Sequence, residues 1–106
     1  MIELGALWRR GGDGGADDDA TLATPGATRL LFVCMGNICR SPTAEGVMRA
    51  KLRGAGLHRR VVVDSAGMLD HHRGEPPDPR AIKHAALRGY DLSALRARQV
   101  DPIDFQ

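Results

Sequence analysis

The sequence of 106 residues has only two cysteines, no long apolar stretch and no internal repeat. Cys34 and Cys39 lie too close together to cross-link a secreted scaffold, so we expect a reducing, cytoplasmic setting. Without a long apolar stretch no membrane-spanning helix is expected, and residues 1–8 lack the flanking pattern of a signal peptide. The length leaves room for one small domain.

Two further absences concern metal and nucleotide sites. The cysteines have a Cys-x4-Cys spacing and no second pair completes four ligands, which disfavours zinc. No Gly-Lys-Ser/Thr stands at a helix start, which excludes a Walker loop. We therefore expect no metal, no cofactor, and neither nucleic acid nor membrane as a partner.

The first 27 residues differ in composition from the rest of the chain. They are rich in glycine and aspartate, and their small apolar surface cannot offset the entropy of ordering. We predict a disordered extension over residues 1–27 and one domain over residues 28–106. Two arginines and five acidic residues give the extension a net charge of −3, whereas thirteen basic and eight acidic residues give the rest +5. A basic domain suits an anionic substrate, but a mixed solvated surface explains the charge equally well.

The first two elements are predicted from apolar patterning. The run Arg29–Val33 ends at Cys34 and is typical of a strand buried on both faces, as in a parallel sheet. Ser41 then provides a helix N-cap and Pro42 the first helical position, and Gly54 ends an amphipathic helix. Its buried face is expected to hold Ala44, Val47, Met48, Lys51 and Leu52, and its exposed face Glu45, Arg49 and Arg53.

The next two elements repeat this order. Val61–Val63 predicts a second buried strand, ended by a turn over residues 64–67. Asp78 and Pro79 again indicate a helix start, with Gly89 as the stop. The order strand, helix, strand, helix predicts an α/β fold with right-handed crossovers. Only two strands are evident, which leaves an unpaired apolar edge where self-association or a partner chain could form. One face of the second helix is expected to hold Ile82, Ala85 and Ala86.

The loop from Cys34 to Ser41 joins the end of a strand to the start of a helix, where α/β sheets place ligands. Backbone N–H groups of such a loop can converge on one anion, and the helix dipole favours negative charge there. Gly36 and Asn37 tolerate the left-handed or sharply turned backbone that this requires. The expected phosphate-binding residues are Met35, Gly36, Asn37, Ile38 and Cys39.

Three side chains of this loop predict nucleophilic chemistry. The fields that hold a phosphate would also lower the pKa of the Cys34 thiol. Arg40 offers a planar fork for two phosphate oxygens, and Ser41 can donate its hydroxyl to the sulfur. Together they predict in-line attack and a cysteinyl-phosphate intermediate. Taken singly, Cys34 could be a small buried hydrophobe and Arg40 a solvated helix residue.

These residues carry a resemblance to a known family. Residues 31–45, LFVCMGNICRSPTAE, closely resemble the opening of low-molecular-weight protein tyrosine phosphatases, and residues 64–67, 74–81, 97–100 and 104–105 match further family motifs. The resemblance implies a three-layer, doubly wound, flavodoxin-like parallel sheet, of which only the first two strands are evident. It implies Cys34 as nucleophile, Arg40 as phosphate-binding arginine and Ser41 as the serine that supports the thiolate.

The resemblance also implies supporting and redox roles. Asn37 matches the asparagine that holds the loop, and Ser65 the serine that hydrogen-bonds to it. Cys39 matches a second cysteine that can form a reversible disulfide with the nucleophile, which fits a thiolate beside a second thiol. The alternative is that Cys39 only packs.

Three positions depart from the family pattern. His71, next to His72, stands where relatives have an aromatic residue that stacks on the substrate, although both could be exposed loop histidines. A histidine that supports the asparagine in many relatives is missing from residues 93–96, and His84 is expected to be a solvated helix residue. Relatives continue to an Asp-Pro loop that carries the general acid, so we expect a C-terminally truncated chain without that acid. Asp78 and Asp101 are expected to be helix N-caps instead.

The sequence therefore predicts a protein-tyrosine phosphatase that acts on phosphotyrosine proteins or aryl phosphates, with impaired turnover. The alternative from another class is a non-catalytic phosphate-binding or interaction remnant. An arsenate reductase would need further cysteines for its electron relay. A simple redox thiol pair would leave Asn37, Arg40 and Ser41 unexplained.

Overall fold

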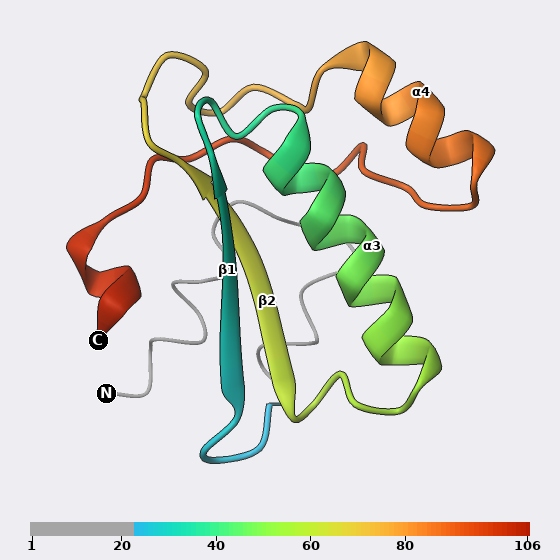
Figure 1. Ribbon diagram of the computed structural model, residues 1–106, viewed down its shortest axis with the longest axis vertical. Helices are drawn as coiled ribbons and strands as arrows, with labels where there is room; N and C mark the ends of the chain where they lie inside the picture. The colour runs from blue at the N-terminus through green and yellow to red at the C-terminus, as the bar shows by residue number, and fades with distance from the viewer. Residues whose placement is uncertain (1–22) are drawn as a thin grey trace.

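A computed structural model describes residues 23–106 and shows two parallel strands with helices between and after them (Figure 1). The elements are β1 (Thr28–Cys34), α3 (Arg40–Gly54), β2 (Val61–Gly67), α4 (Pro79–Leu87) and a 3-10 helix (Pro102–Phe105). This order confirms the predicted α/β class. Most of the predicted disordered extension, residues 1–22, lies outside the described residues.

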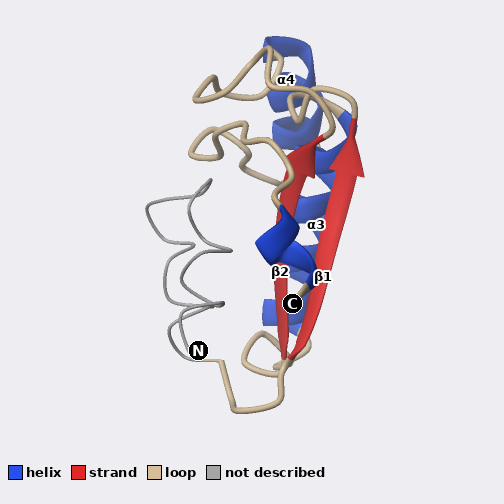
Figure 2. Cartoon of the chain, turned by 90° about the vertical axis from the view of Figure 1, so that its left-hand side faces the viewer, coloured by secondary structure: helices blue, strands red, loops and turns tan. Residues whose placement is uncertain are grey.

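The two strands run parallel, with Thr28 opposite Val61 and Cys34 opposite Gly67. Both strands therefore end at the same edge of the sheet, where the loop after β1 begins. Figure 2 shows α3 lying along one face of the sheet, as expected for the crossover helix of a β-α-β unit. This arrangement places the loop that starts at Cys34 beside the chain that leaves β2.

The second strand is longer than predicted. The turn expected over residues 64–67 is wrong, because β2 continues through them to Gly67. Asp64 and Ser65 remain in the strand although they are buried, since both find polar partners inside the fold. Gly67 allows the loop to approach, because an added Cβ would lie 2.9 Å from the carbonyl carbon of Gly36.

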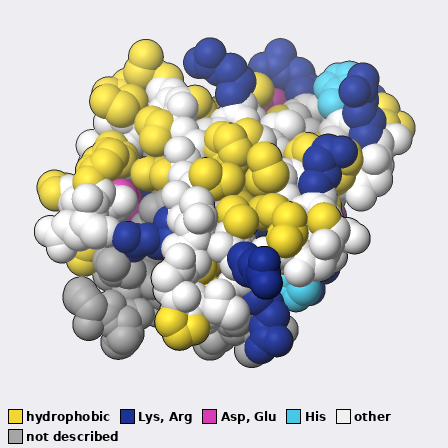
Figure 3. Space-filling view, turned by 60° about the horizontal axis from the view of Figure 1, so that its bottom comes forward, with side chains coloured by type: hydrophobic (Ala, Val, Ile, Leu, Met, Phe, Trp, Pro, Cys, Tyr) yellow, Lys and Arg dark blue, Asp and Glu magenta, His cyan; other side chains and the backbone are white. Residues whose placement is uncertain are grey.

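The first strand is less buried than predicted. The expectation of burial on both faces is wrong for β1, whose residues are mostly half-buried and whose Val33 is 43 % exposed. Within residues 23–106 the sheet has two strands, so no described strand pairs with the second edge of β1. Figure 3 shows hydrophobic side chains gathered in the middle of the surface it brings forward, with Lys and Arg around them.

Helix α3 turns a polar face toward the sheet. Glu45, predicted to be exposed, is only 2 % exposed, and the Arg49 side chain is 12 % exposed. The predicted orientation is wrong because Glu45 and Arg49 pair with each other and with β2. The apolar residues expected on the buried face are only half-buried, and Lys51 is exposed.

Helix α4 starts as predicted, because the side chain of Asp78 accepts a hydrogen bond of 2.7 Å from the backbone N–H of Arg80. Ala85 packs with Leu92 and Leu95 in a small core that Ile82 also contacts, whereas Ala86 is exposed. Leu92 also approaches α3 so closely that a Cβ on Gly46 would lie 2.3 Å from it. The segment after α4 thus fixes α4 against α3.

Described residues that precede residue 28, the predicted start of the domain, are hydrogen-bonded to the rest of the chain. The backbone N–H of Thr24 donates to the carbonyl of Arg59 at 2.8 Å, and a turn then leads into β1. Nothing in residues 23–106 forms a helix with the length and apolar character needed to cross a bilayer.

Candidate active site

The predicted phosphate-binding loop leaves β1 at Cys34 and enters α3 at Arg40. Asn37 has φ 59°, the left-handed conformation predicted for it. Gly36 lies against the ring of His72, since a Cβ there would be 3.0 Å from the Cδ2 atom of the histidine. The loop is therefore both sharply turned and closely covered.

Ser41 lies inside α3 and not at its cap. The helix begins one residue earlier, Cys39 is the N-cap residue, and no side chain caps the helix. The prediction that Ser41 caps the helix is wrong, because its hydroxyl is directed to the loop. Its Oγ is 3.0 Å from the Sγ of Cys34 and accepts a hydrogen bond of 2.8 Å from the Nδ2 of Asn37.

The environment of Cys34 favours a thiolate. Burial raises the pKa of Cys34, but hydrogen bonds from the Ser41 hydroxyl and from the backbone N–H groups of Ser41, Asn37 and Cys39 lower it more. The result is a pKa of about 7, below the ordinary value of 9.0. A substantial part of Cys34 is then ionised at neutral pH, as a nucleophile requires.

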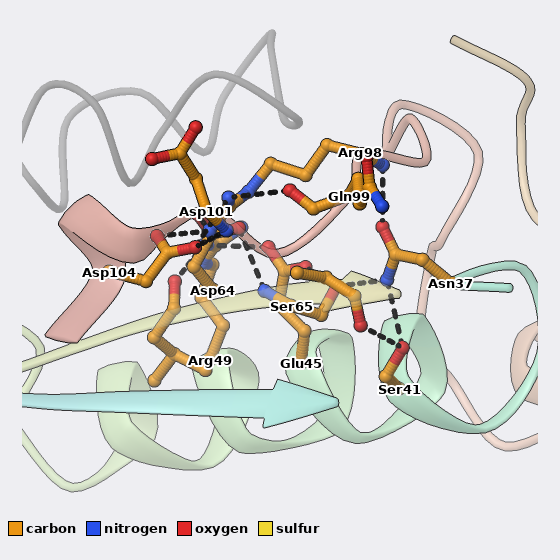
Figure 4. A network of polar contacts seen from close by, with 12 residues as sticks. Asn37, Ser41, Glu45, Arg49, Asp64, Ser65, Arg98, Gln99, Asp101 and Asp104 are labelled. Carbon is orange, nitrogen blue, oxygen red and sulfur yellow. Dashed lines mark hydrogen bonds and ion pairs between the residues drawn. The ribbon is translucent and has the colours of Figure 1, made fainter. Parts of the chain in front are cut away.

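Asn37 joins the loop to two distant segments (Figure 4). Its Nδ2 donates to the Oγ of Ser65 on β2 at 2.9 Å, in addition to Ser41. Its Oδ1 accepts from the backbone N–H of Arg98 at 2.9 Å. Asn37 is 2 % exposed, so these bonds satisfy a buried amide and hold the loop in place.

A buried network of charges lies beneath this amide. Ser65 donates its hydroxyl to Glu45 at 2.6 Å, and Glu45 forms an ion pair of 2.9 Å with Arg49. Arg98 pairs with Asp64 at 3.1 Å and with Asp104 at 2.9 Å. The network thus connects α3, β2 and the 3-10 helix below the loop (Figure 4).

Two carboxyl groups of the network hold their protons more tightly than usual. Burial, together with the nearby charge of Glu45, raises the pKa of Asp64 to about 7, although Arg98 opposes this shift. Burial also raises the pKa of Glu45. Sequence reasoning missed the network formed by Glu45, Arg49, Asp64, Arg98 and Asp104. The sequence holds one signal for such a network, because Glu45 lies in an amphipathic helix and Asp64 directly follows an apolar strand.

The loop forms the floor of a cavity of about 270 Å³, which we call the active-site hollow. It is lined by Cys34, Met35, Gly36, Ile38, Cys39, Arg40, Leu69, His71 and His72. Every residue predicted to bind substrate lines it except Asn37, which supports it from below together with Ser41 and Ser65. Sequence reasoning missed Leu69 and a lining role for His72, whose Nδ1 is 2.9 Å from Glu75.

The two aspartates that precede prolines are helix caps, as predicted. Asp78 caps α4 and pairs with Arg80 at 3.2 Å. Asp101 accepts from the backbone N–H of Ile103 at 3.0 Å at the start of the 3-10 helix, and Asp104 completes a capping box. Neither Asp78 nor Asp101 lines the active-site hollow.

The described residues contain no group of three or more His, Cys, Asp and Glu side chains placed to hold a metal ion. Both cysteines are free thiols, with Cys34 partly buried and Cys39 exposed. The residues that line the hollow supply a thiol with a lowered pKa, a guanidinium and backbone N–H donors.

Comparisons with known proteins agree with this chemistry. Residues 29–106 match the family model described as low molecular weight phosphotyrosine protein phosphatase. A low molecular weight protein-tyrosine-phosphatase of Streptomyces coelicolor is 53 % identical over 64 residues, which cover 60 % of this chain and 39 % of that protein. A low molecular weight phosphotyrosine protein phosphatase of Sus scrofa is 43 % identical over 77 residues, covering 72 % of this chain and 48 % of that protein.

The fold is also similar to solved structures. The crystal structure of a protein tyrosine phosphatase from Entamoeba histolytica, with Hepes in the active site, superposes with a TM-score of 0.70 and 42 % identity. The match covers 74 % of this chain and 50 % of that one. The chain spans about half the length of the curated relatives it matches. The matching family model and these similarities show that the chain belongs to the low molecular weight phosphotyrosine protein phosphatase family.

Proposed function

We propose that the chain hydrolyses phosphomonoesters through a cysteinyl-phosphate intermediate. The observation that carries this proposal is the 3.0 Å contact between the Sγ of Cys34 and the Oγ of Ser41, at the floor of a hollow where the pKa of Cys34 is about 7. The thiolate attacks phosphorus, an S–P bond forms, and the bond from phosphorus to the leaving oxygen breaks. Water then attacks the phosphocysteine and releases inorganic phosphate and the thiolate.

Arg40 and the loop backbone hold the phosphate in this proposal. Arg40 lines the hollow at the first residue of α3, and its guanidinium can bind two phosphate oxygens at once. The backbone N–H groups of the loop and the start of α3 add donors and a favourable dipole. Asn37 and Ser65 keep these donors in position without touching the substrate.

We propose phosphotyrosine proteins or aryl phosphates as substrates. Met35, Leu69 and His71 are among the residues that line the hollow, and they offer apolar and aromatic surface to a ring. His71 is exposed and could move to stack on a phenyl ring. The family of the chain supports the same substrate class.

Turnover depends on protonation of the leaving oxygen. No carboxylate of residues 23–106 lines the hollow, and general acid help contributes about 10²–10⁴-fold to rate. We therefore propose that this chain releases acidic leaving groups such as nitrophenolate much faster than tyrosine phenolate. A rate that depends steeply on the pKa of the leaving group would support this.

The test is hydrolysis of nitrophenyl phosphate by the full chain and by a Cys34→Ser variant. Hydrolysis by the chain alone, together with an acid-quenched phosphoenzyme that Cys34→Ser lacks, is the expected outcome. Equal rates of nitrophenyl phosphate hydrolysis by the two proteins would contradict the proposal.

A second candidate is a phosphate-binding protein without turnover. The absence of a carboxylate from the hollow, among the residues the structure describes, favours it. Calorimetry with phosphate or vanadate separates the two functions, because binding without hydrolysis would leave only this candidate.

We further propose a cellular location and a surface for assembly. A thiolate nucleophile must remain reduced, so we place the protein in the cytoplasm, with Cys39 beside Cys34 as a protective thiol. The second edge of β1 is proposed as the surface for self-association or a partner chain. Light scattering of the purified chain at several concentrations tests this assembly.

A further inference from the structure

A second and larger cavity lies between α3 and α4 and is not explained by the chemistry of Cys34. Figure 1 shows α4 beside the N-terminal end of α3, and a groove of about 1120 Å³ runs between the two helices. We call it the α3–α4 groove. Its lining includes Arg40, Val47, Arg80, Ala81, His84 and Arg88.

The groove is continuous with the active-site hollow. Cys39 and Arg40 line both cavities, so they form the boundary between them. A substrate whose phosphate is held by Arg40 would therefore have its neighbouring residues at the entrance of the groove. The volume of the hollow, about 270 Å³, leaves no room for those residues inside it.

The groove has the charge and surface of a site for an acidic peptide. Three arginines and one aspartate line it, which gives the lining a net charge of +2 with histidine counted as neutral. The aspartate, Asp78, already pairs with Arg80 at 3.2 Å. Arg40 and Arg88 are exposed, and Val47 and Ala81 add apolar surface to the lining. Such a combination favours carboxylates carried on a peptide over a free anion.

The length of the groove defines how much peptide it can hold. Arg80 lies in the first turn of α4, and Arg88 is the residue that caps its C-terminal end. They are eight positions apart, which corresponds to about 12 Å at the rise of an α-helix. An extended peptide advances about 3.3 Å per residue, so about three or four residues span this distance. The start of α4 lies at the loop, where the backbone N–H of Asp78 donates to the carbonyl of Ile38. A carboxylate three or four residues beyond one that contacts Arg80 would therefore reach Arg88.

We propose that the α3–α4 groove binds the acidic residues that flank the phosphorylated residue of a protein substrate. The inference rests on the proposed function, because it takes the phosphate to lie over Cys34. Within it, Arg88 determines specificity through charge and is not part of the reaction. The ligand class is an acidic phosphopeptide.

The experiment uses two phosphotyrosine peptides of identical composition. One carries three aspartates within about six residues of the phosphotyrosine, three or four residues beyond the entry to the groove, and the other carries them more than eight residues away. The ratio of kcat/KM for the first peptide over the second is measured for the full chain and for Arg88→Glu. We expect the ratio to exceed one in the full chain and to fall about fivefold in Arg88→Glu, the loss of one exposed charge pair.

Arg60→Glu is the matched control, because Arg60 is also exposed and lies outside the groove. It changes the net charge by the same amount and is expected to keep the ratio of the full chain. Arg88→Gln repeats the test without charge reversal in case the glutamate disturbs the end of α4. An unchanged ratio in both Arg88 variants, or an equal fall in Arg60→Glu, would overturn the inference.

Binding to Cys34→Ser separates this inference from the proposed function. Fluorescence anisotropy with the same two peptides measures affinity without turnover, in Cys34→Ser and in Cys34→Ser combined with Arg88→Glu. If the chain does not hydrolyse nitrophenyl phosphate but the affinity ratio still depends on Arg88, the groove is an acidic-peptide site and the proposed catalysis fails. If hydrolysis depends on Cys34 but neither ratio depends on Arg88, the groove inference fails alone.

Discussion

Arg98 donates its backbone N–H to the Oδ1 of Asn37 at 2.9 Å, across 61 positions of the sequence. The asparagine lies in the phosphate-binding loop and the arginine in the segment before the 3-10 helix. The side chain of Arg98 meanwhile pairs with Asp64 and Asp104. One residue thus joins the loop to the buried charges, which makes the geometry of the active-site hollow dependent on a distant part of the chain.

Replacing Asn37 should therefore damage both stability and activity. Asn37→Ala removes three hydrogen bonds of a buried amide, each with a net contribution of about 0.5–1.5 kcal/mol. It also places alanine at φ 59°, where an L-residue is strained by about 1 kcal/mol. We expect urea unfolding to show a loss of about 2.5–5.5 kcal/mol, and kcat/KM for nitrophenyl phosphate to fall at least tenfold.

Asn37→Gly is the matched variant for this prediction. Glycine loses the same hydrogen bonds but adopts positive φ without strain, so it should be more stable than Asn37→Ala by about 1 kcal/mol. Its kcat/KM should remain as low as that of the alanine variant. Full activity of Asn37→Gly would show that the amide does not hold the loop.

The reactivity of Cys34 should follow a pKa of about 7. In a Cys39→Ser background, Cys34 is the single thiol, and its alkylation by iodoacetamide reports the thiolate fraction. Because the folded-state pKa is lowered from 9.0, the alkylation rate should reach half its maximum near pH 7 and rise no further above pH 9. Adding Ser41→Ala removes a donor to the thiolate and should raise this midpoint by about one pH unit. An unshifted midpoint would mean that Ser41 does not stabilise the thiolate.

The local features of this molecule could be predicted from the sequence. Asn37 adopts the left-handed backbone that its residue type allows, and Asp78 and Asp101 cap helices because each stands directly before a proline at a helix start. These features depend on residues within a few positions of one another. For the same reason, the contiguous loop beginning at Cys34 could be recognised as a phosphate-binding segment.

The predictions that were wrong concern residues whose partners lie far away along the chain. Periodicity assigned Glu45 to the exposed face of α3, but Ser65, 20 positions away, donates its hydroxyl to the carboxylate of Glu45 inside the fold. The same partners keep β2 extended where a turn was predicted. The hydrogen bond from Arg98 to Asn37 uses a backbone N–H, which every residue except proline carries. The pattern of side chains in the sequence therefore could not predict this bond. The hydroxyl of Ser41 could either cap a helix or hydrogen-bond to a thiolate. The three-dimensional structure is needed to show that it lies next to the Sγ of Cys34.

Asp64 should make folding stability depend on pH. Its folded-state pKa is raised to about 7 by burial and by Glu45, from an ordinary value of 3.8. Between these values the folded state binds a proton that the unfolded state has lost, so the free energy of unfolding should fall as pH rises from 4 to 7. Above about pH 8, where Asp64 is ionised in both states, this contribution is constant. Urea unfolding at pH 5, 6 and 7 measures the slope of the free energy of unfolding against pH. Glu45 should make this slope steeper, because its pKa is also raised.

Two variants isolate this effect. Asp64→Asn keeps an acceptor for Arg98 but cannot ionise, so the slope between pH 5 and 7 should become smaller. Asp70→Asn is the control, since Asp70 is exposed and its pKa is lowered by Arg73, which places its titration below this range. A slope that Asp64→Asn leaves unchanged would assign the pH dependence to other groups.

Asp101 should matter for stability but not for chemistry. Its side chain caps the 3-10 helix and does not line the active-site hollow, although it stands before a proline, as the family's general acid does. Asparagine caps helices as well as aspartate does, whereas alanine does not, so Asp101→Asn should unfold like the parent and Asp101→Ala should lose about 1 kcal/mol. A general acid would behave differently, because the asparagine cannot donate a proton to the leaving oxygen. We therefore expect kcat for phenyl phosphate to stay within about twofold in both variants, against the 10²–10⁴-fold that loss of an acid would cause. A large fall in kcat for Asp101→Asn with unchanged stability would instead identify Asp101 as the proton donor.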